Sequence, residues 1–126
     1  MLITLTDELT TVPPKGVEVL ILNAQTIDET KSVVVCPTSG IRNHTITLKA
    51  SAALTGNIYI ETANDPNYTG QWNPLSIVNA ADIPVVGVGA AGELQLMFSN
   101  VTFIALRVRI ETVIAGGTLS ASYLGN

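Results

Sequence analysis

The sequence is poor in cysteine, histidine and charged residues. It contains one cysteine and one histidine in 126 residues, so neither an internal disulfide nor a zinc site built on cysteines is available. Charged residues make up 13% of the chain, about half of the share in ordinary globular domains. Nucleic-acid binding requires a basic patch, and the 6 Lys and Arg residues are too scattered to form one. A composition that is 47% hydrophobic with a net charge of −4 excludes intrinsic disorder.

Long apolar runs are missing as well. The longest weakly polar segment, residues 83–92, is half as long as a membrane span and contains one proline and three glycines. The first 16 residues lack the basic start and apolar core of a secretion signal. No basic amphipathic helix is present that could bind a membrane surface. We therefore expect no membrane association.

Val, Ile and Thr are abundant, and this composition favours strands over helices. The clearest alternation places Leu106, Val108 and Ile110 opposite Arg107 and Arg109. The segments that we interpret as strands are residues 17–22, 31–36, 42–50, 57–62, 74–79, 83–88, 93–99, 103–112 and 118–124. About eight or nine short strands separated by Gly, Pro and Asn turns predict an all-β fold, an antiparallel β-sandwich of the jelly-roll or Ig-like type.

The chain begins with a segment that differs from these strands. Residues 1–16 are rich in threonine and end at a breaker that contains two prolines, so we expect an extended N-terminal arm. The remaining residues, 17–126, are expected to form a single β-sandwich domain. An extended arm can add a strand to the sheet edge of a neighbouring molecule. The apolar arm residues that we expect to contact such a partner are Leu2, Leu5, Leu9 and Val12.

The residues that could serve catalysis or bind a metal are isolated from one another in the sequence. His44 has no second histidine to act with, and we expect it to be a solvent-exposed residue at the start of a strand. Cys36 follows three valines and is expected to be a small buried hydrophobe rather than a reactive thiol. The carboxylates Glu61, Asp65 and Glu111 are not paired at a catalytic spacing. We expect them to be surface charges, with a cross-strand ion pair to the arginines.

The loops offer two weak motifs and one aromatic group. Residues 64–70 carry oxygen ligands but a single carboxylate, which favours a turn over a calcium site. Residues 87–92 match the dinucleotide fingerprint, but an alternating strand follows them where the fingerprint needs a helix. We expect Trp72, which follows a loop, to plug one end of the sandwich core, and the alternative is a stacking platform for sugars with Tyr68 and Tyr59. We expect no catalytic site, no cofactor and no metal.

Two runs of residues resemble a known family. Residues 56–65 (GNIYIETAND), followed by Trp72 and Leu75, are similar to a motif of the small β-sandwich virion proteins of tailed bacteriophages. Residues 103–110 (FIALRVRI), followed by 116–121 (GGTLSA), resemble the ending of the same proteins. The resemblance implies a capsid decoration or cement protein, which clamps neighbouring subunits of the shell by burial and strand addition, without catalysis.

The resemblance also implies partners and a location. The expected partner is the major capsid protein, the expected location is the capsid surface of the virion, and synthesis would take place in the host cytoplasm. We also expect a homo-oligomer, a dimer or a trimer, because small β modules with little charge usually assemble symmetrically. Trp72, Arg107 and Arg109 are expected to join the arm residues in binding the partner.

The sequence also fits other functions. One alternative is a glycan-binding tail or adhesion module, and another is a tail or neck protein of the same fold. An enzyme is the least favoured and would depend on His44, Glu61 and Asp65.

Overall fold

The fold was obtained as a computed structural model, which describes residues 2–4, 13–34, 41–64, 72–85 and 91–126. Its strands are β1 (Leu2–Thr4), β2 (Glu18–Gln25), β3 (Lys31–Val34), β4 (His44–Ala50), β5 (Asn57–Ala63), β6 (Asn73–Asn79), β7 (Gly92–Phe98), β8 (Ala105–Ile110) and β9 (Leu119–Gly125). A short 3-10 turn, η2 (Ala80–Asp82), follows β6. The predicted all-β class is confirmed.

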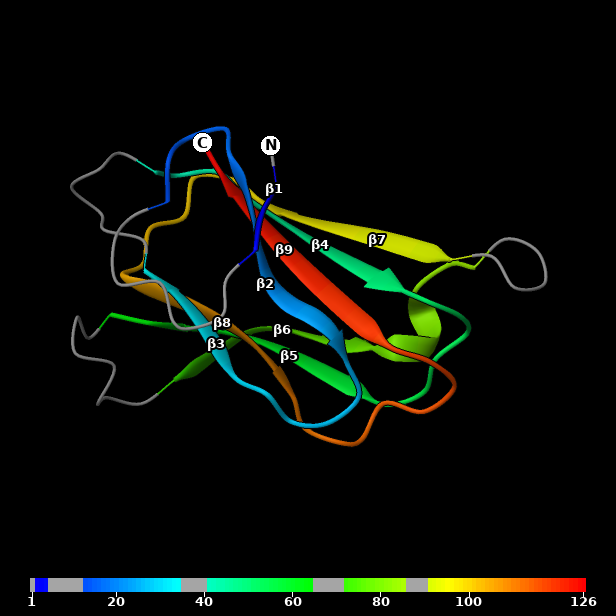
Figure 1. Cartoon of the computed structure of the whole chain (residues 1–126). Coiled ribbons are helices and arrows are strands. Elements are labelled where there is room, and N and C mark those ends of the chain that lie inside the picture. The colour runs from blue at the N-terminus through cyan, green and yellow to red at the C-terminus, as the bar shows by residue number, and fades with distance from the viewer. Residues whose placement is uncertain (1, 5–12, 35–40, 65–71, 86–90) are drawn as a thin grey trace.

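The strands form two sheets that lie face to face (Figure 1). One has five strands in the order β1-β2-β9-β4-β7, and the other has four in the order β3-β8-β5-β6. Strands pair from the outside of the sequence inward: β2 with β9, β3 with β8, β4 with β7 and β5 with β6, all antiparallel. This nested order is that of a jelly roll and resolves the choice that the sequence left open. β1 is the exception, since it pairs in parallel with β2 at the sheet edge.

The core fills the space between the two sheets, as the alternation predicts. Leu106, Val108 and Ile110 of β8 have no exposed surface, and Leu119 and Tyr123 of β9 likewise have none. On β7, the predicted outward residues Glu93, Gln95 and Met97 are exposed, while the residues between them face the core. The predicted faces of these three strands are therefore confirmed.

One predicted strand is wrong in its described part. The chain forms η2 at residues 80–82, and from residues 83–85 only Val85 pairs with another strand, through an isolated bridge to Gly92. Asn79 caps the turn by accepting a hydrogen bond from the Ala81 N–H, and Pro84 has no N–H to donate to a ladder. A strand does follow the glycine motif, as expected, since β7 begins at Gly92. Residues 87–90 of the motif lie outside the described residues.

Several other predicted features also fall outside the described residues. They are Leu5, Leu9 and Val12 of the arm, together with Cys36, Asp65 and Tyr68.

Candidate functional site

Charged and aromatic side chains gather on the outer face of the four-stranded sheet. Tyr59 and Glu61 alternate along β5 with buried isoleucines, and Arg107 and Arg109 alternate along β8 with the buried residues of that strand. The register between β5 and β8 places Glu61 opposite Arg107 and Tyr59 opposite Arg109. All four side chains therefore lie on one face, next to one another.

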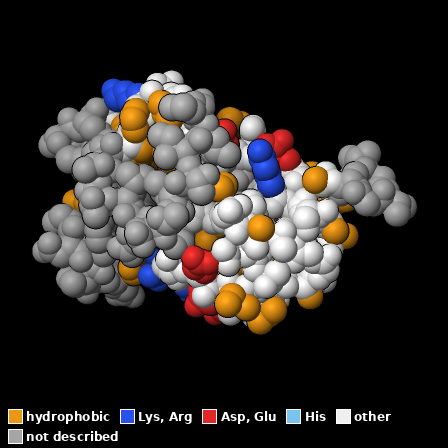
Figure 2. Space-filling view, in the orientation of Figure 1, with side chains coloured by type: hydrophobic (Ala, Val, Ile, Leu, Met, Phe, Trp, Pro, Cys, Tyr) orange, Lys and Arg blue, Asp and Glu red, His pale blue; other side chains and the backbone are white. Residues whose placement is uncertain are grey.

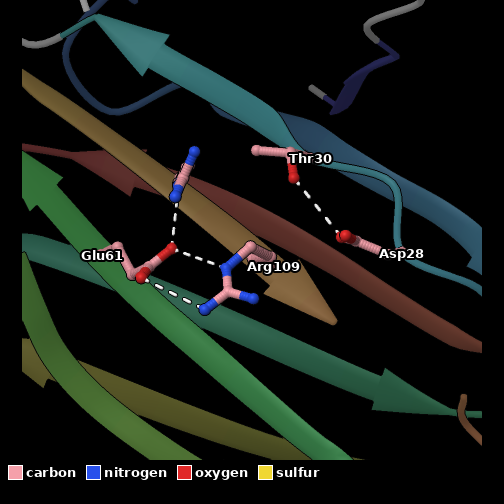
Figure 3. A network of polar contacts seen from close by, with 5 residues as sticks. Asp28, Thr30, Glu61 and Arg109 are labelled. Atoms are coloured by element: carbon pink, nitrogen blue, oxygen red, sulfur yellow. Dashed lines mark hydrogen bonds and ion pairs between the residues drawn. The ribbon is translucent and has the colours of Figure 1, made fainter. Parts of the chain in front are cut away.

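Glu61 is at the centre of this group. Its Oε1 atom accepts hydrogen bonds from Arg107 Nε at 2.8 Å and from Arg109 Nε at 3.0 Å. Arg109 also donates from Nη2 to Oε2 at 3.4 Å, so that its guanidinium binds both carboxylate oxygens (Figure 3). The expected cross-strand ion pair is confirmed, and its acid is Glu61. The expectation that Glu61 is a surface charge is wrong, because the residue is buried.

The electrostatics of Glu61 result from two opposing effects. Burial of the carboxyl raises its pKa, because the residue is only 7% exposed. The hydrogen bonds and charges of Arg109 and Arg107 outweigh burial and hold the pKa below its ordinary value. The hydrogen bond to Glu61 in turn raises the pKa of Arg109. Glu61 is thus held ionised, which suits an ion pair and does not suit a general acid.

Each arginine also covers an aromatic ring. The Cζ atom of Arg107 lies 4.3 Å from the ring centroid of Trp72, and that of Arg109 lies 4.7 Å from the ring centroid of Tyr59. Both distances are within the range of cation–π attraction. A hydrogen bond to Glu111 raises the pKa of the Tyr59 hydroxyl. We call these five residues, in the order Trp72, Arg107, Glu61, Arg109 and Tyr59, the arginine–aromatic row.

The structure brings part of the predicted partner-binding set together. Trp72, Arg107 and Arg109 lie in the row, and Trp72 is a half-buried residue on the sheet surface rather than a plug in the core. Leu2 lies in β1, at the edge of the other sheet. The sequence predicts an ion pair to the arginines but does not indicate which carboxylate forms it. Tyr59 and Glu61 alternate with Ile58 and Ile60, which indicates that both lie on an outer face. The register that places them beside the arginines depends on the pairing of β5 with β8 and cannot be predicted from either strand alone.

His44 corrects a prediction, because it is buried rather than exposed. Its residue number has the same parity as those of Ile46 and Leu48, so it points into the core, where it is 1% exposed. Nε2 lies 2.8 Å from the Val101 carbonyl oxygen, and Nδ1 lies 2.6 Å from the Tyr123 hydroxyl. A carbonyl can only accept, so Nε2 carries the proton and Nδ1 accepts from the Tyr123 O–H. The ring stacks on Phe103 at 4.3 Å between centroids.

The described residues hold no other group with evident chemistry. Within them, no three His, Cys, Asp or Glu side chains come together in a way that could hold a metal ion. No helix in this part of the chain is long and apolar enough to cross a membrane. A small hollow on the outer face of the five-stranded sheet is lined by Glu18, Leu20, Thr47, Lys49, Ser120, Ala121 and Ser122. The Ser122 hydroxyl donates to Glu18 there, which ties β9 to β2.

Comparison with known proteins supports the fold. The SPBc2 prophage-derived protein YomS has a similar structure, with a TM-score of 0.58 and 16% identity over 92% of this chain and 96% of that one. A chitosan-binding module of a chitosanase/glucanase from Paenibacillus sp. IK-5 is more distant, with a TM-score of 0.47 and 16% identity over 89% of this chain and 79% of the module. No known protein family matches the sequence, and no curated protein does so either.

Proposed function

We propose that the chain is a structural protein of a phage particle, which binds the capsid shell as a decoration or cement protein and has no catalytic role. The observation that carries this proposal is how its reactive side chains are used. Both nitrogens of His44 are hydrogen-bonded inside the core, and Glu61 is bound by two arginines. Both side chains are also buried, with His44 1% and Glu61 7% exposed, so neither is accessible to a substrate.

The surface and the fold add support. Charged side chains form a few separate patches on the described surface in Figure 2, and uncharged groups cover most of the rest. Such a surface can be buried against another protein without the cost of desolvating many ions. The jelly roll is a fold that capsid proteins use, and YomS, which shares the architecture over nearly its whole length, is prophage-derived.

The proposed binding mode combines the N-terminal arm and the row. The arm, residues 1–16, would contact a neighbouring shell subunit through Leu2, Leu5, Leu9 and Val12, while the sandwich of residues 17–126 rests on the shell. Trp72 and the two arginines would contribute from the four-stranded sheet. Aromatic and arginine side chains are enriched at protein interfaces, where they supply much of the binding energy.

Sedimentation with shells tests the proposal. Empty shells are assembled from the major capsid protein of the phage or prophage that encodes the chain, and bound protein is counted per shell subunit. We expect the full chain to bind at a fixed ratio and deletion of residues 1–16 to reduce occupancy at least about tenfold, since a lost strand removes several main-chain bonds. Circular dichroism of the deleted chain controls for folding. Absence of binding by the full chain would contradict the proposal. Unchanged occupancy after the deletion would contradict the role of the arm.

The row itself favours a second candidate, glycan binding by a tail or adhesion module. Trp72 and Tyr59 lie on the same face, with arginine N–H groups between them. Rings can stack on sugars, and the guanidinium groups can donate to hydroxyls. Titration of Trp72 fluorescence with host surface polysaccharide tests this. Saturable quenching that Tyr59→Ala weakens and Ser120→Ala leaves unchanged would support it, since Ser120 lies in β9 of the other sheet. No quenching would remove it.

A further inference from the structure

The two edges of the five-stranded sheet differ. At one edge, β1 adds a strand beyond β2. At the other edge, β7 pairs with β4 along its whole length, and in the described part of the chain only Val85 pairs with its outer side, at Gly92. From Glu93 to Phe98, no described strand pairs with that edge.

Apolar side chains along β7 are less covered than their neighbours in the same sheet. Leu94, Leu96 and Phe98 face the core but are only half-buried, whereas the core-facing residues His44, Ile46 and Leu48 of the adjacent β4 are at most 1% exposed. On the outer face of β7, Met97 is 72% exposed. One further strand beside β7 would cover both groups.

β7 also lacks the features that usually keep an edge strand from pairing. It has no proline, its register with β4 shows no bulge over 7 residues, and Glu93 is its one charged residue. Natural edge strands commonly carry several charges, a proline or a bulge at such a position. An edge without these features is suited to accept a strand.

We propose that β7 pairs antiparallel with β7 of a second copy of this chain, about a two-fold axis at Gln95. Gln95 is the midpoint of Gly92–Phe98, so this register gives the greatest overlap of the two strands. It sets Glu93 of each copy opposite Met97 of the other, and Gln95 opposite Gln95. The two glutamates are thereby kept apart, and the five-stranded sheets of the two copies join into one. The pairing does not depend on the phage role.

Cysteine scanning tests the register directly, because residues opposite each other in an antiparallel pair are close enough for a disulfide. In a Cys36→Ser background, Gln95→Cys should cross-link to itself under mild oxidation. Glu93→Cys alone should not, because it faces Met97, but a mixture of Glu93→Cys and Met97→Cys chains should cross-link. Ser120→Cys, in the middle strand of the sheet, is the control for random collision.

Charge substitution at one position provides a test without cross-linking. Met97→Glu places a glutamate opposite Glu93 twice in each dimer, and Met97→Lys places an opposite charge there. The residue opposite Met97 within its own chain is Thr45, which is neutral, so the two variants should fold equally well. We expect light scattering to give a mass twice the chain's 13.2 kDa for the wild type. Met97→Glu should weaken dimerisation about tenfold relative to Met97→Lys.

Three results would overturn the proposal. One is a wild-type mass that stays at 13.2 kDa up to millimolar concentration. Another is equal dimerisation of Met97→Glu and Met97→Lys. The third is self-cross-linking of Glu93→Cys as efficient as that of Gln95→Cys, which would mean that the chains associate in another register or by another surface.

Discussion

Neutralising Glu61 should destabilise the protein measurably. Glu61→Gln removes the negative charge that attracts two arginines and replaces one acceptor oxygen with an amide N–H group. Since a hydrogen bond to a charged group contributes about 1.5–3 kcal/mol and only part of each is lost, the change costs about 1 kcal/mol for each arginine. The guanidinium side chains are 21% and 24% exposed, so water screens part of this loss. Relief of the buried carboxylate's desolvation offsets a further part. We therefore expect a net loss of about 1–2 kcal/mol at neutral pH, which urea unfolding resolves.

The same variant tests the ionisation of Glu61. Because the arginines hold its pKa in the folded protein below the ordinary value of 4.5, ionised Glu61 contributes its stability above that pH. The contribution is lost as the pH falls through the pKa of the folded state. The difference in unfolding free energy between wild type and Glu61→Gln should therefore shrink as the pH is lowered from about 7 to about 3.

A control and a double-mutant cycle complete the experiment. Asp82→Asn removes an exposed carboxylate and should change stability by less than about 0.5 kcal/mol. Arg107→Met, combined with Glu61→Gln, should cost about 1 kcal/mol less than the sum of the single changes. If Glu61→Gln is as stable as the wild type at neutral pH, or if the difference persists at about pH 3, the ion pair has no such role.

Two further sites give predictions that unfolding experiments can check. Tyr123→Phe leaves Nδ1 of His44 without a donor and should cost about 1–2 kcal/mol. Burial lowers the pKa of His44, so stability should fall as the pH drops below its ordinary value of 6.5, and the double variant His44→Phe/Tyr123→Phe should lose that dependence. Gly116→Ala should cost at least about 2 kcal/mol, because φ is +99° and the new Cβ would lie 2.3 Å from the Ala53 oxygen. At Gly16, φ is +75° and an added Cβ would have no neighbouring atom within 4 Å, so Gly16→Ala should cost only about 1 kcal/mol. Equal losses of stability at the two glycines would contradict the role of the Cβ clash at Gly116.

Most of the fold prediction rested on the alternation of apolar and polar residues along each strand. It identified the faces of β7, β8 and β9 correctly, because one side of each strand is buried in the core. It could not give the strand order, since alternation fixes which side of a strand is buried and not which strand lies beside it. The nested pairing that defines the jelly roll depends on contacts such as β2 with β9, which join opposite ends of the sequence.

The site was predicted only in part, because alternation shows which residues share a face and not which strands are neighbours. Arg107 and Arg109 were expected on a polar face, but their partner Glu61 lies 46 and 48 positions away in the sequence. The exposure expected for His44 is wrong because it groups the residue with its polar neighbours, whereas its even number places it on the same face as Ile46 and Leu48. Its side chain can be buried because both nitrogens find partners, Val101 and Tyr123, and neither partner is adjacent to it in the sequence.

The position of β1 changes what arm binding would require. Its pairing with β2 extends over only three residues and is parallel, which gives a weak ladder. If the arm docks on a neighbouring shell subunit, β1 must leave its own β2 and add to a strand edge of that subunit. Because only three residues pair with β2, few main-chain bonds are lost, and those gained on the neighbour offset them. Release of the arm at β2 and strand pairing at β7 would involve opposite edges of the five-stranded sheet, and one copy could therefore make both contacts at once.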